Sequence, residues 1–256
     1  MFKIVRIAVL LFILFFVSVS SWLTQARSTD WEDSLWVKLY PINADGSQAA
    51  ADYIAALDVA DFEPIEAFIA RETGRWGRPI ERPVRIELGT PIREQPPAVA
   101  PGAGFLGVMT WSLKLRFWAG RVAGEQDEIT PHIRIFVRYH SPDMHLMLEN
   151  SVGLQKGMVG IVNAYAGRRQ RGANQVIIAH ELLHTLGASD KYDPATGQPV
   201  APHGLGEPER VPLYPQRYAE IMGGRIALAV DDAVVPKSLG FALIGPLTAS
   251  EIRLID

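Results

Sequence analysis

The sequence predicts a mixed α+β fold, and three features of the chain indicate it. Segments with alternating apolar residues, typical of strands, and segments with a helical period both occur before residue 190. They do not follow the regular strand–helix–strand order of a purely parallel sheet. Beyond Pro194 the prolines are closely spaced, which predicts an irregular C-terminal subdomain.

The composition is that of a chain that buries a core, with 48 % apolar and 21 % charged residues. A net charge of −3 provides no basic field, so we expect no nucleic-acid partner. Because cysteine is absent, disulfides, thiolate metal ligands and a cysteine nucleophile are excluded. A bound metal would therefore be held mainly by His, Asp or Glu side chains.

The N-terminus has the layout of an export signal, with Lys3 and Arg6 ahead of an apolar run at 7–23. At 17 residues this run is short for a membrane helix and long for the core of a signal peptide. Small residues at Ser21 and Ala26 fit a cleavage site only loosely. We expect an uncleaved N-terminal membrane helix, with a removed signal peptide as the alternative.

The distribution of positive charge predicts the orientation of this segment. Lys3 and Arg6 favour a cytoplasmic N-terminus, so the folded part is expected on the extracytoplasmic side, or secreted or periplasmic if the signal is cleaved. We therefore divide the chain into a signal-anchor or signal peptide at 1–30 and one folded domain at 31–256.

The expected elements follow in chain order. Strands are predicted at 36–41, 84–88, 133–139 and 158–165, and the clean alternation at 133–139 indicates one face in water. Helices are predicted at 49–57, 62–76 and 174–186, and the segment 107–118 fits either a helix or a strand. Residues 91–104 are expected to form a loop. A last helix is expected at 248–254, with Thr248 and Glu251 forming a capping box.

The chemically informative segment is His180-Glu181-Leu182-Leu183-His184, inside the predicted helix at 174–186. Residues four apart lie on one side of a helix, so both imidazoles can reach one zinc ion. Glu181 lies on the adjacent rim, where its carboxylate can hold a water molecule and take its proton. In so apolar a helix, two histidines and a glutamate would be costly to bury without a charged partner.

The third zinc ligand is expected just beyond the helix. Gly187 can adopt the left-handed conformation that ends a helix, and Asp190 follows three residues later. His180, His184 and Asp190 would leave a fourth position for water, as a catalytic zinc requires. Asp193, His203 and Glu207 are competing candidates for the third ligand.

The string His-Glu-x-x-His-x-x-Gly-x-x-Asp resembles the signature of zincin metallopeptidases of the metzincin type. Asp190 stands where a third histidine is usual, a variant similar to that of the snapalysin-like enzymes. The segment Glu220-Ile221-Met222-Gly223-Gly224 resembles the Met-turn that lies beneath the metal in that clan. The resemblance also implies that the strand at 158–165 is the edge strand that aligns an extended substrate.

We therefore expect a zinc metallopeptidase, with Glu181 as general base and a peptide or protein as substrate. Tyr192 and Tyr218 flank the site in sequence and are candidates for stabilising an oxyanion. One alternative is a non-catalytic, zinc-braced module that binds a partner in the cell envelope. Another is an amidase that uses the same residues on a non-protein substrate such as a cell-wall peptide.

Overall fold

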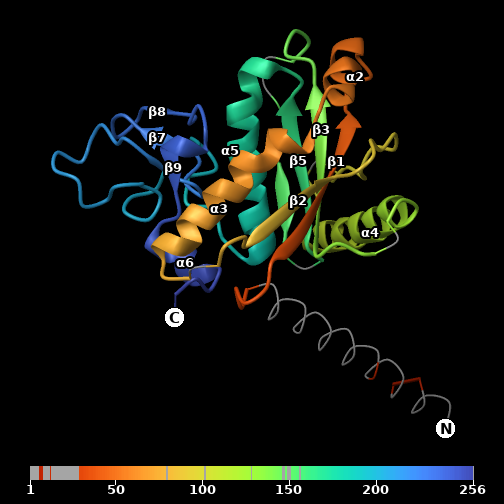
Figure 1. The fold of residues 1–256 in the computed structure, drawn as a ribbon, viewed down its shortest axis with the longest axis horizontal. Helices are drawn as coiled ribbons and strands as arrows, with labels where there is room; N and C mark the ends of the chain where they lie inside the picture. The colour runs from red at the N-terminus through yellow and green to blue at the C-terminus, as the bar shows by residue number, and fades with distance from the viewer. Residues whose placement is uncertain are drawn as a thin grey trace.

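A computed structural model of the chain describes residues 29–78, 80–100, 102–127, 129–145, 148, 151–155 and 157–255, together with 6, 7 and 12 (Figure 1). Apart from Ile7 and Phe12, the apolar run at 7–23 lies outside these residues, so the expected membrane anchor stays a prediction. A search of the described residues finds no helix that is both long and apolar enough to span a bilayer.

A five-stranded mixed sheet forms the centre of the fold, with strand order β2-β1-β3-β5-β4. The strands are β1 (Leu35–Asn43), β2 (Val84–Leu88), β3 (Ile133–His140), β4 (Val152–Leu154) and β5 (Val159–Tyr165). The first four in spatial order run parallel, and β4 pairs antiparallel with β5 at the edge. The predicted mixed α+β class is confirmed, and a strand occurs at each of the four predicted places.

Helices cover both faces of the sheet (Figure 1). One face packs against α2 (Gln48–Ala55), α3 (Glu63–Arg75) and α5 (Arg171–Leu186), with short 3-10 turns η1 (Val59–Phe62) and η2 (Arg168–Gln170). The other face packs against α4 (Phe105–Gly124). The segment that fitted either a helix or a strand is therefore helical, and it provides a separate cluster of apolar contacts.

Alternation along β3 sends side chains into two different cores. Ile133, Ile135 and Val137 join the core with α5, whereas Phe136 joins the one with α4 and packs against Trp118 at a ring-centroid distance of 4.7 Å. The predicted wet face of this strand is thus wrong. Because α4 covers that face, every residue of β3 is buried except Arg134 and Arg138, which are half-buried.

Residues 187–255 contain few and short regular elements: β6 (Ala219–Glu220), β7 (Ile226–Ala227), β8 (Ala233–Val234), η3 (Leu239–Phe241), β9 (Ala242–Leu243) and α6 (Pro246–Glu251). The irregular character expected of this part is confirmed. The predicted capping box is wrong, because α6 begins after Gly245 with Pro246 in its first turn. Thr248 instead donates a buried hydrogen bond to Glu220, 2.6 Å away.

Candidate metal centre

Helix α5 holds His180 and His184 on one side, as their spacing predicts. Leu182, Leu183 and the other apolar residues of the helix are buried in the core, so the helix position is determined by packing. The two imidazole rings stand nearly perpendicular, with centroids 4.6 Å apart. Gly187 ends the helix in the left-handed conformation, at φ 109°, and turns the chain back toward the histidines.

The backbone determines which ring nitrogens face the site. Nδ1 of His180 lies 2.9 Å from the carbonyl oxygen of Ile221, and Nδ1 of His184 lies 2.7 Å from that of Ala188. A carbonyl oxygen only accepts, so each Nδ1 must carry the proton and donate. In the neutral rings both Nε2 lone pairs are consequently free, which is the arrangement found in metal-binding histidines.

Asp190 brings one carboxylate oxygen to both imidazoles. Its Oδ1 lies 3.1 Å from Nε2 of His180 and 3.1 Å from Nε2 of His184. Ligand atoms on a tetrahedral zinc with bonds of about 2.0 Å are roughly 3.3 Å apart, so these separations fit a shared ion. Without a cation, each Nε2 would need a second ring proton to bind the carboxylate. The donor set therefore fits zinc.

The charges around this set are consistent with an ionised carboxylate. Burial raises the pKa of Asp190, but hydrogen bonds from His180 and His184 outweigh it and hold the pKa well below its usual range. Burial lowers the pKa of His184, yet the Asp190 contact and the charge of Glu181 leave it raised. The protein thus favours positive charge at this point, which a divalent cation would supply.

Glu181 faces the same site but has an unsatisfied oxygen. Its side chain is buried, and within the described part of the chain Oε2 has no hydrogen-bond partner. A carboxylate oxygen of Glu181 and one nitrogen of each histidine all lie within 4.8 Å of one another. Burial raises the pKa of Glu181, which suits a group that must accept a proton near neutral pH.

The competing candidates for the third ligand do not reach the histidines. Asp193 accepts hydrogen bonds from the backbone of Ala195 and the hydroxyl of Thr196 within its own turn. Glu207 forms an ion pair with Arg217. His203 is exposed. Of the four candidates, only Asp190 is in contact with both imidazoles.

The turn that resembles a Met-turn lies directly beside the histidines. Met222 is fully buried, and the carbonyl of the preceding Ile221 is the one that orients His180. Glu220 holds the turn together, since its Oε2 accepts from the backbone N–H of Met222 at 2.7 Å and of Gly223 at 2.9 Å. The sequence pattern indicated the turn, but no local signal marks the role of Glu220.

A contact from the C-terminal helix positions the loop that carries Asp190. Glu251 accepts hydrogen bonds from the backbone of Ser189 at 3.0 Å and from Nζ of the buried Lys191 at 2.7 Å. Both neighbours of Asp190 are thereby tied to α6. The local pattern predicted a capping role for Glu251 instead, because no local signal links residues about sixty positions apart.

Strand β4 passes close to the site. A Cβ on Gly153 would lie 2.7 Å from the carbonyl oxygen of Glu181 and would also clash with His184, so only glycine fits here. The strand predicted to be the substrate-aligning edge, now β5, is instead enclosed between β3 and β4. That prediction is wrong because the short β4 adds one more strand, and β4 is the edge nearest the histidines.

The two tyrosines differ in position. The Tyr192 ring lies 6.3 Å from the His180 ring, and burial followed by the charges of Asp190 and Glu181 raises its pKa, so the phenol keeps its proton. Tyr218 is exposed, and its ring centroid lies 6.0 Å from the guanidinium carbon of Arg217. Tyr192 is thus the one of the pair placed beside the histidines.

Comparison with known proteins adds little to this geometry. Neither a family model nor a curated protein matches the chain. One solved structure that matches, described as "Structure of a chaperone-substrate complex", is 13 % identical, with a TM-score of 0.43. The match covers 86 % of this chain, which spans 37 % of the length of that one.

Proposed function

We propose that the chain is a zincin-like, zinc-dependent metallopeptidase. The observation that carries the proposal is the convergence of two Nε2 atoms and one carboxylate oxygen, with the unpartnered Oε2 of Glu181 beside them. Two imidazoles that both donate through Nδ1 can meet the same carboxylate oxygen only if each carries a second ring proton or if they share a cation. A zinc ion bound by these residues would supply a Lewis acid and lower the pKa of a water molecule.

The chain's own residues then have distinct tasks. Ile221 and Ala188 hold the imidazoles through their carbonyls, so the ligand geometry is preorganised. Glu181 accepts the proton of the attacking water at Oε2 and donates it to the nitrogen of the leaving amine. Its raised pKa brings that proton exchange closer to neutral pH.

An extended peptide has a place to bind at the edge of β4. Residues 152–154 pair with β5 on one side, are half-buried, and have no further strand beyond them in the described part of the sheet. A substrate strand added there would place its backbone next to Gly153, which contacts Glu181 and His184. Tyr192 can donate a hydrogen bond to the oxyanion that forms on the attacked carbonyl.

The decisive test is Glu181→Gln in the chain from residue 31. We expect zinc content to persist and peptide hydrolysis to fall by roughly 10²- to 10⁴-fold, the usual contribution of a general base. Glu209→Gln, at an exposed position, serves as the matched control. Unchanged hydrolysis in Glu181→Gln would eliminate the mechanism and favour the zinc-braced binding module.

The same variants distinguish the two substrate classes. The amidase alternative uses identical residues, so a protein substrate and cell-wall peptide fragments should be digested side by side. If only the cell-wall fragments are cleaved, and Glu181→Gln abolishes that cleavage, the proposed mechanism holds but the substrate is a cell-wall peptide.

A further inference from the structure

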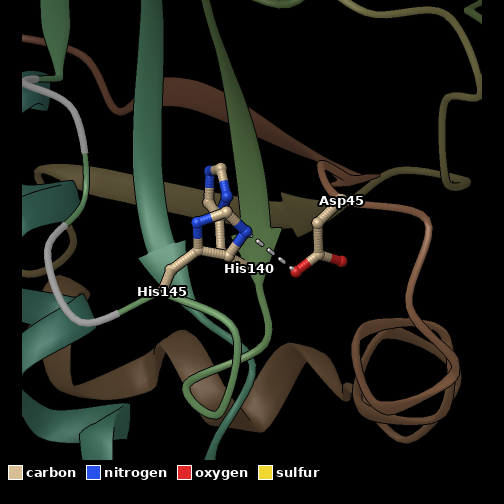
Figure 2. A group of neighbouring side chains, drawn as sticks. All are labelled: Asp45, His140 and His145. Carbon is tan, nitrogen blue, oxygen red and sulfur yellow. Dashed lines mark ion pairs between the residues drawn. The ribbon is translucent and has the colours of Figure 1, made fainter.

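A second group of metal-ligand side chains lies at the carboxyl ends of the parallel strands (Figure 2). His140 is the last residue of β3, His145 belongs to the turn that follows, and Asp45 comes two residues after β1. One ligand atom from each lies within 4.8 Å of the others. Crevices outside the carboxyl ends of parallel strands are the usual ligand sites of such sheets.

The tautomer of His140 is determined by its neighbours. Its Nε2 lies 3.0 Å from Oδ1 of Asn163, and Nη1 of Arg138 lies 3.0 Å from the same atom. A guanidinium only donates, so that atom must be the amide oxygen and Nε2 of His140 must donate to it as well. In the neutral ring, Nδ1 then has a free lone pair.

That lone pair is buried and unpartnered. His140 is 7 % exposed, and its Nδ1 has no hydrogen-bond partner among the described residues. Burial lowers the pKa of His140, so the ring stays neutral at neutral pH. A buried acceptor without a partner costs free energy, unless a ligand fills the space in front of it.

His145 and Asp45 complete the group, but they do not form a good hydrogen bond with each other. Nε2 of His145 lies 3.5 Å from Oδ2 of Asp45, too far for a good hydrogen bond, and has no hydrogen-bond partner in the described chain. The rings of His140 and His145 meet nearly at right angles, with centroids 5.1 Å apart.

Asp45 is held in place by the backbone and is ionised. Its Oδ2 accepts from Ser141 N–H at 2.7 Å and its Oδ1 from Ser47 N–H at 3.0 Å. Burial raises the pKa of Asp45, but hydrogen bonds from Ser47 and Ser141 outweigh it and lower the pKa to about 2. A carboxylate oxygen that accepts a single hydrogen bond keeps a further lone pair for a cation.

We propose that Asp45, His140 and His145 form a second binding site for a divalent transition-metal ion of the zinc class. Two imidazoles and one carboxylate are the donors that such ions prefer. Asn163 would act as the positioning residue, because its oxygen fixes the ring of His140 as outer-shell groups do in metal sites.

This site is separate from the one on α5. It shares no residue with it, and it lies at the strand ends from which the chain enters α5 at Arg171. His180 comes nine residues further along that helix, or about 13 Å at the helical rise. The ion would join the loop after β1 to the turn after β3, two segments 95 residues apart, and so stabilise this end of the sheet.

The test is metal stoichiometry in the full chain, with Zn²⁺ and Co²⁺ as probes. We expect two equivalents in the wild type, one in His184→Ala, one in His145→Ala and none in the double variant. His203→Ala, at an exposed histidine, should keep both. The visible absorption of Co²⁺ bound to His184→Ala would report the second site alone. Adding His145→Ala to that variant should abolish this absorption.

The outcomes distinguish this proposal from the peptidase proposal. Two equivalents in His145→Ala, or one equivalent in the wild type that His184→Ala removes, would overturn the second site. One wild-type equivalent removed by His145→Ala would instead support it and contradict zinc binding on α5. Asp45→Asn repeats the test with an isosteric side chain that keeps one of the two acceptor oxygens, and an unchanged thermal midpoint of the metal-free variant would show that loss of metal there is not loss of the turn.

Discussion

Two buried glutamates near the histidines, Glu181 and Glu220, differ in how many hydrogen bonds their carboxylates accept. Glu181 is 4 % exposed, and its Oε2 has no partner in the described chain. Glu220 is fully buried, and its two oxygens accept four hydrogen bonds, from Met222, Gly223, Gly245 and Thr248. Burial raises the pKa of both carboxyls.

The difference shows how the donors around a carboxylate decide its role. Four donors fix Glu220 between the turn at 220–223 and the start of α6, so its side chain holds the backbone that orients His180. Glu181 lacks such donors on one oxygen and keeps a lone pair toward the site. A satisfied carboxylate stabilises structure, whereas an unsatisfied one is available for proton transfer.

The largest effect on stability is expected for Glu220→Ala. Four buried donors would lose their acceptor, so we expect a loss of about 3–5 kcal/mol in the free energy of unfolding, as for other broken buried networks. Urea unfolding of the metal-free chain measures it. Glu209→Ala, at the surface, should change the midpoint little. Equal midpoints for the two variants would refute the structural role of Glu220.

A smaller effect is expected for Glu251→Gln, which acts on the metal through the loop at 189–191. Losing the charge contact with Lys191 should weaken zinc binding roughly 10- to 100-fold, as other outer-shell changes do. A competition titration with a chelator measures this. Unaltered affinity would show that Asp190 is positioned by its own turn alone.

The same residue has a defined pH dependence. Burial raises the pKa of Glu251, but hydrogen bonds from Lys191 and Ser189 leave it lowered in the folded protein. Its contribution to stability is therefore present above the ordinary glutamate pKa and is lost as pH falls through the folded value. The difference in the free energy of unfolding between the wild type and Glu251→Gln, measured by urea unfolding at several pH values, should therefore shrink in acid.

The smallest effect, with the opposite sign, is expected for Glu181→Gln in the metal-free chain. Because the folded pKa of Glu181 is raised, its charged form opposes folding as pH rises from the unfolded to the folded pKa. At neutral pH the amide should stabilise the fold by on the order of 1 kcal/mol. Thermal unfolding of both proteins across this pH range tests it. A destabilised Glu181→Gln would place Glu181 in the same class as Glu220.

Local patterns predicted most of the regular elements. Alternation located β1, β2, β3 and β5, and helical periodicity located α2, α3 and α5, because these signals depend on neighbouring residues alone. Local patterns were insufficient where one element covers another. Neither the helical state of the segment at 107–118 nor the dry outer face of β3 is visible until α4 packs on the sheet.

What the sequence by itself determined is the pairing of His180 with His184 and the place of Glu181 beside them, since one helical turn sets that geometry. Only the tertiary structure decided that Asp190 meets both imidazoles, that Ile221 orients one of them, and that Glu251 holds the loop. The cluster of Asp45, His140 and His145 likewise depends on the parallel pairing of β1 with β3. Strand pairing and loop docking join residues tens of positions apart, and no local spacing records which distant segments will meet.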